Sequence, residues 1–329
     1  MMKDHTIRDV AEAAGVSTAT VSRVLAAENA GRVSEETRRR VHFAVEALGY
    51  RANHAARSLK TRSSRTVGVI APELANSFFM DLAEGIEGVL DAGGYTLLLA
   101  SSSNSVEEEK KRISAFTDRM VDGMVIIPAG SSGDHLKALA ERLPVVQVDR
   151  FVEGADLDTV VSDNEGGCFE LTGALLRDGY TRIGFAGGDI TLSTARERLS
   201  GYGRALAEAG ITPEPEWICL GGMGIEDGYR RMETILAGKT PPEALVAVNL
   251  LVHLGVQRYL LDHPEGKMII AGFDESPFTP FLPLCRYTAA QNAVEIGKQA
   301  GCRIMEKIRH KEGRTECRII RLPVTINSH

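Results

Sequence analysis

The 329-residue sequence has no run of 18 or more apolar residues, and no charged start followed by a short apolar segment. The first absence excludes a membrane-spanning helix and the second a secretory signal peptide, so we expect a cytoplasmic protein with no membrane contact. Its five cysteines are scattered, odd in number and never spaced C-x-x-C. Reduced thiols are therefore expected, and neither a disulfide framework nor a zinc site.

The sequence also lacks the short motifs that carry common enzyme chemistry. No P-loop, nucleophile elbow, metal-ligand cluster or G-x-G-x-x-G turn follows a predicted strand. The glycine-rich residues 184–188 are interrupted by Ala186, which favours an ordinary turn. Asp163 and Asp274 could form an acid–base pair acting on a sugar, but no other feature supports catalysis. We predict no enzymatic activity, no cofactor and no metal.

Composition is that of a soluble globular protein, with 43% hydrophobic and 25% charged residues. The net charge of −6 is divided unevenly along the chain. Residues 1–65 carry 12 Lys+Arg against 7 Asp+Glu, whereas the remainder carries 26 against 37. A small basic arm on an acidic body indicates a segment that binds a polyanion, although a solvated charged face is the alternative.

Three short amphipathic helices are predicted in the first 50 residues. Thr6 caps the first, which ends at Gly15; the second covers residues 17–25, and the third runs from the Ser34 cap to Gly49. A tight turn joins the first two, which is typical of a helix-turn-helix. An ordinary three-helix bundle remains the alternative.

The outer face of the second helix carries Thr18, Ala19, Ser22 and Arg23. Short side chains let a helix enter the major groove, where Arg can bridge the two acceptors of guanine and Thr or Ala can contact a thymine methyl group. This pattern indicates DNA binding.

The same residues resemble the head of the lactose-repressor/galactose-repressor (LacI/GalR) family of regulators. The matching motifs are D-V-A-E-A-A-G-V-S at 9–17, T-V-S-R-V-L at 20–25, V-S-x-x-T-R at 33–38 and L-G-Y-x-x-N at 48–53. The resemblance implies base contacts from the second helix and phosphate contacts from Thr6, Thr20, Tyr50 and Asn53. The full predicted DNA-binding set is Thr6, Ser17, Thr18, Ala19, Thr20, Ser22, Arg23, Tyr50, Asn53, Ala56, Leu59 and Lys60.

Residues 53–60 predict a helix of about two turns, too short to be stable alone in water. The polar, basic residues 61–65 predict a linker. In the family this segment is a hinge helix that pairs with its dimer mate, and Leu59 matches the leucine wedged into the minor groove. A packed linker leucine is the alternative.

From Thr66 onward, short β-branched runs alternate with amphipathic helices, which predicts parallel sheets covered by helices. Thr159–Asn164 is the predicted seam between two lobes. The predicted strands are 66–71, 95–100, 123–127, 144–149, 182–186, 217–220, 244–248 and 268–273, with a long helix at 292–309 and a closing strand at 317–322. The predicted fold is α/β: an all-α helix-turn-helix head and two doubly wound lobes resembling a periplasmic-binding-protein core.

The predicted domains are the head at 1–52, a hinge and linker at 53–65, and an effector-binding and dimerisation body at 66–329. Within the body we assign about 66–162 and 292–322 to the N-lobe, and about 163–291 and 323–329 to the C-lobe. The resemblance implies a homodimer on double-stranded, near-palindromic operator DNA. A leucine-heptad extension, which some members use to form tetramers, is absent after Pro323.

Polar and aromatic residues just past the predicted strand ends are the candidates for binding a small molecule. Carboxylates, amides, arginines and phenyl rings together suit a sugar-sized hydroxylated ligand. Each candidate residue taken alone has an ordinary structural alternative: a helix cap, a surface charge or a core residue. The predicted effector-binding set is Asn76, Phe78, Phe79, Arg150, Phe151, Asp163, Arg198, Asn249, Asp274 and Gln291.

By resemblance, Arg198, Asn249 and Asp274 are the principal effector contacts of the C-lobe. One departure is that the family's usual Asn-Asp is Asn249-Leu250 here, so Leu250-Leu251 narrows the pocket or favours a less polar ligand. We expect a repressor of a carbohydrate-utilisation operon answering to a sugar, sugar phosphate or sugar acid. The alternatives are a nucleobase effector or a non-DNA sugar-binding protein, and whether the effector induces or co-represses stays open.

Overall fold

The computed structural model describes residues 5–25, 33–50, 63–238, 240–264, 268–310 and 317–329. The chain divides into two compact units, residues 1–64 and 65–329, and each is described by itself. The predicted hinge at 53–60 lies outside the described residues, and so do Asn53, Ala56, Leu59 and Lys60.

The head is built from α1 (Ile7–Ala14), α2 (Thr18–Leu25) and α3 (Glu35–Leu48). Asp9 accepts hydrogen bonds from the backbone N–H and the hydroxyl of Thr6, at 2.6 and 3.0 Å, which fixes the start of α1. Gly15 ends that helix in a left-handed conformation, at a φ of 60°. Val10, Val21 and Val41, one from each helix, are fully buried in a shared core.

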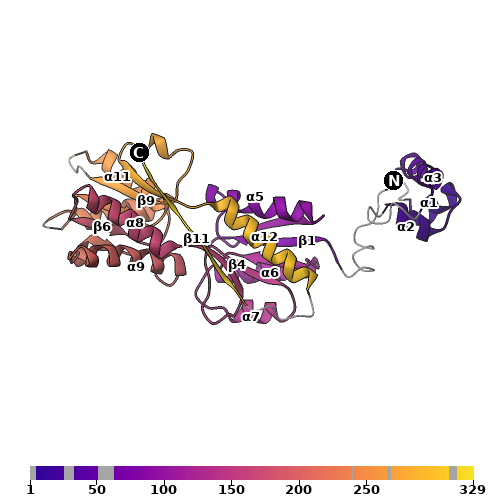
Figure 1. Cartoon of the computed structure of the whole chain (residues 1–329), viewed down its shortest axis with the longest axis horizontal. Helices are drawn as coiled ribbons and strands as arrows, with labels where there is room; N and C mark the ends of the chain where they lie inside the picture. The colour runs from indigo at the N-terminus through magenta and orange to yellow at the C-terminus, as the bar shows by residue number, and fades with distance from the viewer. Residues whose placement is uncertain (1–4, 26–32, 51–62, 239, 265–267, 311–316) are drawn as a thin grey trace. The chain divides into compact units, whose positions relative to one another are not determined.

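The larger unit consists of two lobes, each with a six-stranded sheet (Figure 1). The N-lobe sheet has the order β11-β5-β4-β3-β1-β2. Its strands are β1 (Thr66–Ala71), β2 (Thr96–Ser101), β3 (Gly123–Ile126), β4 (Val145–Val148), β5 (Asp158–Ser162) and β11 (Ile319–Leu322). All of their pairings are parallel.

The C-lobe sheet repeats this arrangement with the order β12-β10-β9-β8-β6-β7. Its strands are β6 (Ile183–Ala186), β7 (Ile218–Cys219), β8 (Ala244–Ala247), β9 (Ile269–Phe273), β10 (Cys285–Ala290) and β12 (Thr325–Ser328). Only β12 pairs antiparallel to its neighbour among these described strands. Each strand of one lobe therefore has a positional equivalent in the other, for example β4 and β9.

Helices cover both faces of each sheet because successive strand residues point to opposite faces. In β1, Val67 and Val69 pack in the core under α5 (Ser77–Ala92) and α12 (Ala293–Arg309). Ile70 packs on the other face, under α6 (Val106–Asp118) and α7 (Asp134–Ala140). The C-lobe helices are α8 (Asn164–Arg177), α9 (Ser193–Glu208), α10 (Ile225–Leu236) and α11 (Leu250–Asp262).

The chain crosses between the two lobes at the seam, and each crossing leads into a helix of the other lobe. The chain leaves the N-lobe at β5 and continues into α8, which packs against α9 in the C-lobe. It returns after β10 into α12, which lies along α5 in the N-lobe (Figure 1). Close helix contact requires glycine: a Cβ on Gly201 would lie 2.1 Å from the carbonyl oxygen of Glu165, and one on Gly85 2.1 Å from that of Val294.

The predicted α/β fold class is confirmed, whereas several elements were not predicted. They are α7, α8, β10 and β12. The sequence of β10, C-R-Y-T-A-A, has little β-branched character, and α8 contains three glycines, so neither gives a clear periodic signal. No helix among the described residues is long and apolar enough to cross a bilayer.

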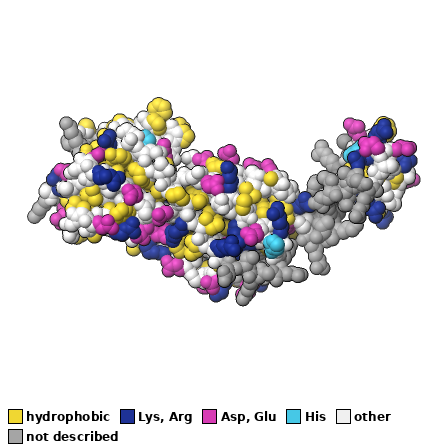
Figure 2. Space-filling model, in the orientation of Figure 1, with side chains coloured by type: hydrophobic (Ala, Val, Ile, Leu, Met, Phe, Trp, Pro, Cys, Tyr) yellow, Lys and Arg dark blue, Asp and Glu magenta, His cyan; other side chains and the backbone are white. Residues whose placement is uncertain are grey.

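Charged side chains of both signs lie on the visible face of the body (Figure 2). Figure 2 shows Lys and Arg side chains interspersed with Asp and Glu side chains over the visible face of residues 65–329. A mixed surface of this kind does not attract a polyanion as an extended basic patch would.

Candidate functional site

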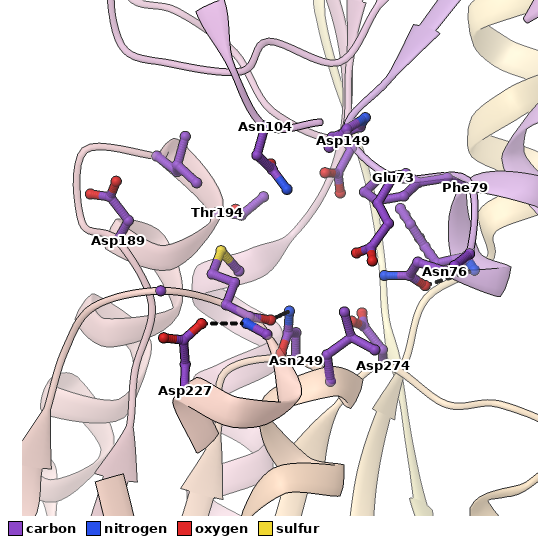
Figure 3. Close-up of a pocket in the computed structure, with 18 of the residues that line it drawn as sticks. Glu73, Asn76, Phe79, Asn104, Asp149, Asp189, Thr194, Asp227, Asn249 and Asp274 are labelled. Atoms are coloured by element: carbon purple, nitrogen blue, oxygen red, sulfur yellow. Dashed lines mark hydrogen bonds between the residues drawn. The ribbon is translucent and has the colours of Figure 1, made fainter. Parts of the chain in front are cut away.

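A cleft of about 1090 Å³ lies where the carboxyl ends of the strands of both lobes meet. Its volume is slightly above the range of about 300–1,000 Å³ that is usual for small-molecule sites. Figure 3 shows Glu73, Asn104 and Asp149 from the N-lobe opposite Asp227, Asn249 and Asp274 from the C-lobe. The doubly wound topology brings these side chains together, since parallel strands end at the same edge of each sheet.

On the N-lobe side, Asn76 caps α5, its Oδ1 accepting from the Phe78 N–H at 3.1 Å. Phe78 and Phe79 line the cleft from the first turn of this helix, with ring centroids 5.3 Å apart in an edge-to-face arrangement. Arg150 lines it after β4 and donates to Asn104 Oδ1 at 2.8 Å. Both apolar rings and amide groups are therefore available to a ligand here.

On the C-lobe side, Asn249 caps α11: its Oδ1 accepts from the Val252 N–H at 2.8 Å, and its Nδ2 donates to the Met223 carbonyl at 3.1 Å. Gln291 Nε2 donates to Asp274 Oδ1 at 2.5 Å. The buried Oε1 of Gln291 accepts no hydrogen bond from any described residue. A buried acceptor without a donor is costly, so a ligand N–H or O–H would relieve it.

Arg198 is a buried cation fixed from several sides. Its Nε donates to Asn164 Oδ1 at 2.8 Å and its Nη1 donates to the Val248 carbonyl at 2.7 Å. The guanidinium carbon lies 3.6 Å from the centre of the Phe273 ring, a cation–π contact. These contacts hold the group rigidly at the cleft wall.

Asp149 and Asp274 occupy equivalent places, directly after β4 and β9. Both have left-handed backbones, at φ of 62° and 73°, and each N–H donates to a carbonyl of the next strand, Val160 and Ala289 respectively. Burial raises the pKa of Asp149 to about 6; Arg150 and Arg198 oppose this rise and Asp274 adds to it.

Carboxylates outnumber cations in the cleft. Six acidic side chains line it: Glu73, Asp149, Asp189, Glu226, Asp227 and Asp274. The three arginines that line it, Arg150, Arg198 and Arg258, all have partners, and Arg258 donates to Glu226 at 2.7 Å. Among the described residues, no group of three or more His, Cys, Asp or Glu side chains is placed to hold a metal ion.

Two predicted effector residues do not line the cleft. Asp163 caps α8, its Oδ1 accepting from the Gly166 N–H at 3.0 Å, so the carboxylate is turned toward the crossover helix. The Phe151 ring lies 5.8 Å from the guanidinium carbon of Arg321, away from the cleft. Lying after a strand does not fix a side chain's direction, so neither residue lines the cleft, and a ligand contact by either stays a prediction. The other eight predicted effector residues line the cleft.

Several lining residues were not predicted, among them Asn104, Asp189 and Asp227. Asn104 and Asp189 come shortly after β2 and β6, so the strand-end rule would have found them had it been applied to every strand. Asp227 lies in the first turn of α10, which that rule does not cover. Of the two leucines after Asn249, only Leu251 lines the cleft, whereas Leu250 is buried. Leu250 instead donates its N–H to Asp274 Oδ2 at 3.4 Å.

In the head, the outer face of α2 has the exposure that DNA reading requires. Thr18, Ala19, Ser22 and Arg23 are all exposed. Ser17 is exposed too, and its hydroxyl accepts from the Thr20 N–H at 3.1 Å. The remaining described members of the predicted set are Thr6, which is exposed, and Thr20 and Tyr50, which are half-buried.

A helix-turn-helix head and a two-lobed core with a ligand-sized cleft define a DNA-binding regulator with a periplasmic-binding-protein-like body. The chain matches the family described as "Bacterial regulatory proteins, lacI family" over residues 6–53. It also matches "Periplasmic binding proteins and sugar binding domain of LacI family" over residues 64–328.

The transcriptional repressor PurR of Aliivibrio salmonicida is 32% identical over 313 residues, covering 93% of each protein. The repressor CytR of Escherichia coli (strain K12) is 33% identical over 311 residues, covering 92% of this chain and 89% of CytR. The Lac repressor dimer bound to operator and the anti-inducer ONPF has a TM-score of 0.85 at 23% identity over 98% of each chain, which shows the fold.

The chain belongs to the LacI family. It is a DNA-binding transcriptional repressor and not an enzyme, as the sequence predicted. Repressors of this family bind operator DNA as dimers and carry an effector in the two-lobed domain.

Proposed function

We propose that this repressor controls a carbohydrate-utilisation operon and answers to a small, uncharged, hydroxyl-rich effector in the interlobe cleft. The observation that carries the proposal is the surplus of acceptors: six carboxylates line the cleft, and its three arginines already have partners. Carboxylates accept from sugar hydroxyls, and the phenyl rings of Phe78 and Phe79 suit the apolar face of a sugar.

Of the sugar-like effectors expected from the sequence, the cleft favours the neutral one. A phosphate or carboxylate group would enter a field set by six acidic side chains, opposed by only three arginines. A nucleobase is the second candidate, because the rings of Phe78 and Phe79 could pack against a planar base.

A thermal-shift screen of the full-length protein tests this proposal. It should compare a neutral hexose or pentose with its phosphate, its aldonic acid and a free nucleobase. A ligand at 100 times its Kd stabilises the protein by about 2.7 kcal/mol, a readily measured rise in Tm. Stabilisation by a phosphorylated sugar but not by its neutral parent would contradict the charge argument.

Asp274→Ala should abolish the response to the ligand that binds, because it removes an acceptor on the cleft wall. Asp163→Asn is the matched control: it changes a strand-end carboxylate outside the cleft while keeping a capping side chain. Loss of operator binding along with the ligand response in Asp274→Ala would mean that Asp274 is structural.

For DNA, we propose that two heads of a homodimer, in the cytoplasm, read the half-sites of a near-palindromic operator. The exposed face of α2 (Thr18, Ala19, Ser22 and Arg23) would contact base edges, with Thr6, Thr20 and Tyr50 at phosphates. The head at 1–52, the hinge at 53–65 and the body at 66–329 would then be successive functional parts. Closure of the lobes on the effector would alter the spacing of the paired hinges and so the affinity for the operator.

In vitro selection from random duplexes should enrich an inverted repeat, whose affinity is then measured by fluorescence anisotropy. Arg23→Ala should weaken binding by about 1–3 kcal/mol, the usual value of a good base contact. Arg39→Ala, an exposed arginine on α3, is the matched control and should change affinity less. Leu59→Ala tests the hinge, and unchanged affinity would remove the hinge from the mechanism.

A further inference from the structure

An ion pair between Glu197 and Arg321 joins the two lobes directly. Glu197, on α9 of the C-lobe, accepts two hydrogen bonds from Arg321, on β11 of the N-lobe. The distances are 3.0 Å from Nη1 to Oε2 and 2.7 Å from Nη2 to Oε1. This paired geometry is the strong form of an arginine–carboxylate contact. The Glu197 side chain is 15% exposed, so solvent screens the pair less than a fully exposed one.

Two further contacts reach the N-lobe from the same end of α9. Ser193 Oγ accepts from the Phe151 N–H at 3.0 Å. Arg196 Nη2 lies 2.6 Å from Glu153 Oε1, and both residues of this pair are well exposed. Phe151 and Glu153 follow β4, so the segment after that strand is attached to α9.

In the first turns of α9, one face of the helix contacts the N-lobe and the adjacent face lines the cleft. Positions 193, 196 and 197 follow the i, i+3, i+4 spacing of one helix face, and all three contact the N-lobe. Thr194 and Arg198, spaced i, i+4 on the adjacent face, line the cleft. A ligand that moves α9 must therefore also strain or release the contacts to the N-lobe.

Hydrogen bonds connect the two faces. Asn164, the first residue of α8, donates from Nδ2 to Glu197 Oε2 at 3.4 Å. Its Oδ1 accepts from Arg198 Nε at 2.8 Å. Arg321, Glu197, Asn164 and Arg198 form a continuous network from the N-lobe strand β11 to the cleft wall. Asn164 is fully buried, so the network is shielded from water where it meets Arg198.

We propose that Glu197 and Arg321 are an interlobe fastener that holds the lobes at the angle seen here and positions Arg198 through Asn164. Because the partners lie on different lobes, their pairing depends on the interlobe angle. The pair therefore biases the equilibrium between lobe arrangements, and an effector that contacts Arg198 acts on the same equilibrium.

The direct test is the distance between the lobes, measured by double electron–electron resonance on the full-length protein. Spin labels are placed at Glu87→Cys on α5 and Glu233→Cys on α10, both exposed, after replacing Cys219, Cys302 and Cys317 by serine. An excess of unlabelled protein removes distances between protomers. The expected result is a narrow distribution for the parent protein and a shifted or broadened one for Glu197→Gln and for Arg321→Gln.

The double charge swap Glu197→Arg with Arg321→Glu should restore the narrow distribution, because it rebuilds the pair in reverse. The matched control is Glu243→Gln, which breaks a pair with Arg182 of similar length, 2.8 Å, lying wholly within the C-lobe. It should leave the distance unchanged. Distributions of Glu197→Gln and Arg321→Gln that superimpose on the parent would overturn the proposal. Should Glu197→Gln fail to fold, Arg321→Gln decides alone, since that side chain is 40% exposed.

A second measurement tests whether the Glu197–Arg321 pair affects the affinity for operator DNA, and it rests on the proposed function. Affinity for the selected operator should change by at least about fivefold in Glu197→Gln, the lower end of usual allosteric coupling, and stay constant in Glu243→Gln. A changed interlobe distance with unchanged operator affinity would keep the fastener but refute its link to DNA. Failure of the parent protein to bind any selected duplex would instead count against the proposed function.

Discussion

The two lobes share one topology but use equivalent positions differently. Asp149 and Asp274 follow equivalent strands with the same left-handed backbone. Asp274 accepts side-chain and backbone hydrogen bonds, from Gln291 and Leu250. Asp149 has the Arg150 Nε at 3.7 Å, and its burial raises its pKa to about 6. Topology thus fixes where a functional side chain lies, and the neighbours decide which hydrogen bonds it accepts.

The closing strands differ in the same way. In the N-lobe, β11 is attached through Asp158, a fully buried carboxylate that accepts from Arg303 Nε at 2.8 Å, Lys307 Nζ at 2.5 Å and the Arg318 N–H at 3.0 Å. In the C-lobe, β12 is attached at the exposed Glu275, which accepts from Asn327 Nδ2 at 2.5 Å. One lobe therefore depends on buried charge where its counterpart uses hydrogen bonds at the surface.

The largest effect should come from Asp158→Ala, because it removes a buried carboxylate that accepts from Arg303, Lys307 and the Arg318 N–H. Breaking a buried ion pair costs about 3–5 kcal/mol of unfolding free energy. Burial acts to raise the pKa of Asp158, but hydrogen bonds from Lys307, the Arg318 N–H and Arg303 outweigh it and lower the pKa. The stabilisation is therefore present above the unfolded pKa of about 3.9 and is lost as pH falls through the lower folded value.

Denaturant unfolding of Asp158→Ala and Glu275→Ala measures the difference between the lobes. Glu275→Ala should cost about 1 kcal/mol or less, since its hydrogen bonds lie at the surface. Equal losses in the two variants would show that buried charge has no special part in the N-lobe.

An intermediate effect should be shared by both lobes at the helix crossings. Gly85→Ala and Gly201→Ala each place a Cβ 2.1 Å from a backbone oxygen, which cannot move as a flexible side chain would. Overpacking of this kind costs about 1–3 kcal/mol, occasionally more. Thermal unfolding should show similar losses for the two variants, because α5 with α12 and α9 with α8 are equivalent pairs.

Each helix supplies its own control glycine. A Cβ on Gly88 in α5 or on Gly203 in α9 meets no atom within 4 Å. Gly88→Ala and Gly203→Ala should therefore stabilise the protein by about 0.4–1 kcal/mol. Destabilisation by the control variants would point to a general intolerance of these helices rather than to the crossing.

The last effect is a gain in stability rather than a loss, and it distinguishes Asp149 from Asp274. Because the folded pKa of Asp149 is raised to about 6, the folded protein retains a proton there that the unfolded chain releases near pH 4. Stability therefore falls as pH rises from about 4 to 6, and the full penalty remains above 6. Asp149→Asn should raise stability at pH 7.5 by about 1–3 kcal/mol, and by less at pH 4.5.

Urea unfolding at the two pH values measures this gain. Asp274→Asn is the comparison: it disturbs the acceptor of Gln291 and should lower stability by about 1 kcal/mol. A uniform gain for Asp149→Asn at both pH values would contradict the assigned protonation. A gain in stability at neutral pH combined with weaker ligand binding would show that Asp149 destabilises the protein but is needed for ligand binding.

The sequence predicted the elements whose signals are local. The Ser34 cap, the Gly15 and Gly49 ends and the β1 strand all lie where expected, because capping and β-branched runs act over a few residues. Asp163 and Gln291 show that local sequence signals do not predict the direction of a side chain. Both follow a strand, yet Asp163 caps a helix while Gln291 faces the cleft. Only the packing around each residue decides between these roles.

What the sequence determined by itself is the family, the fold class and the exposed face of the recognition helix, because periodicity, caps and a dense motif are properties of neighbouring residues. Tertiary structure alone decided which strand-end side chains share the cleft, how many of its arginines are already engaged, and that Glu197 meets Arg321, 124 residues away. Contacts between residues so distant in sequence depend on how the sheets and helices pack, and no local pattern records them.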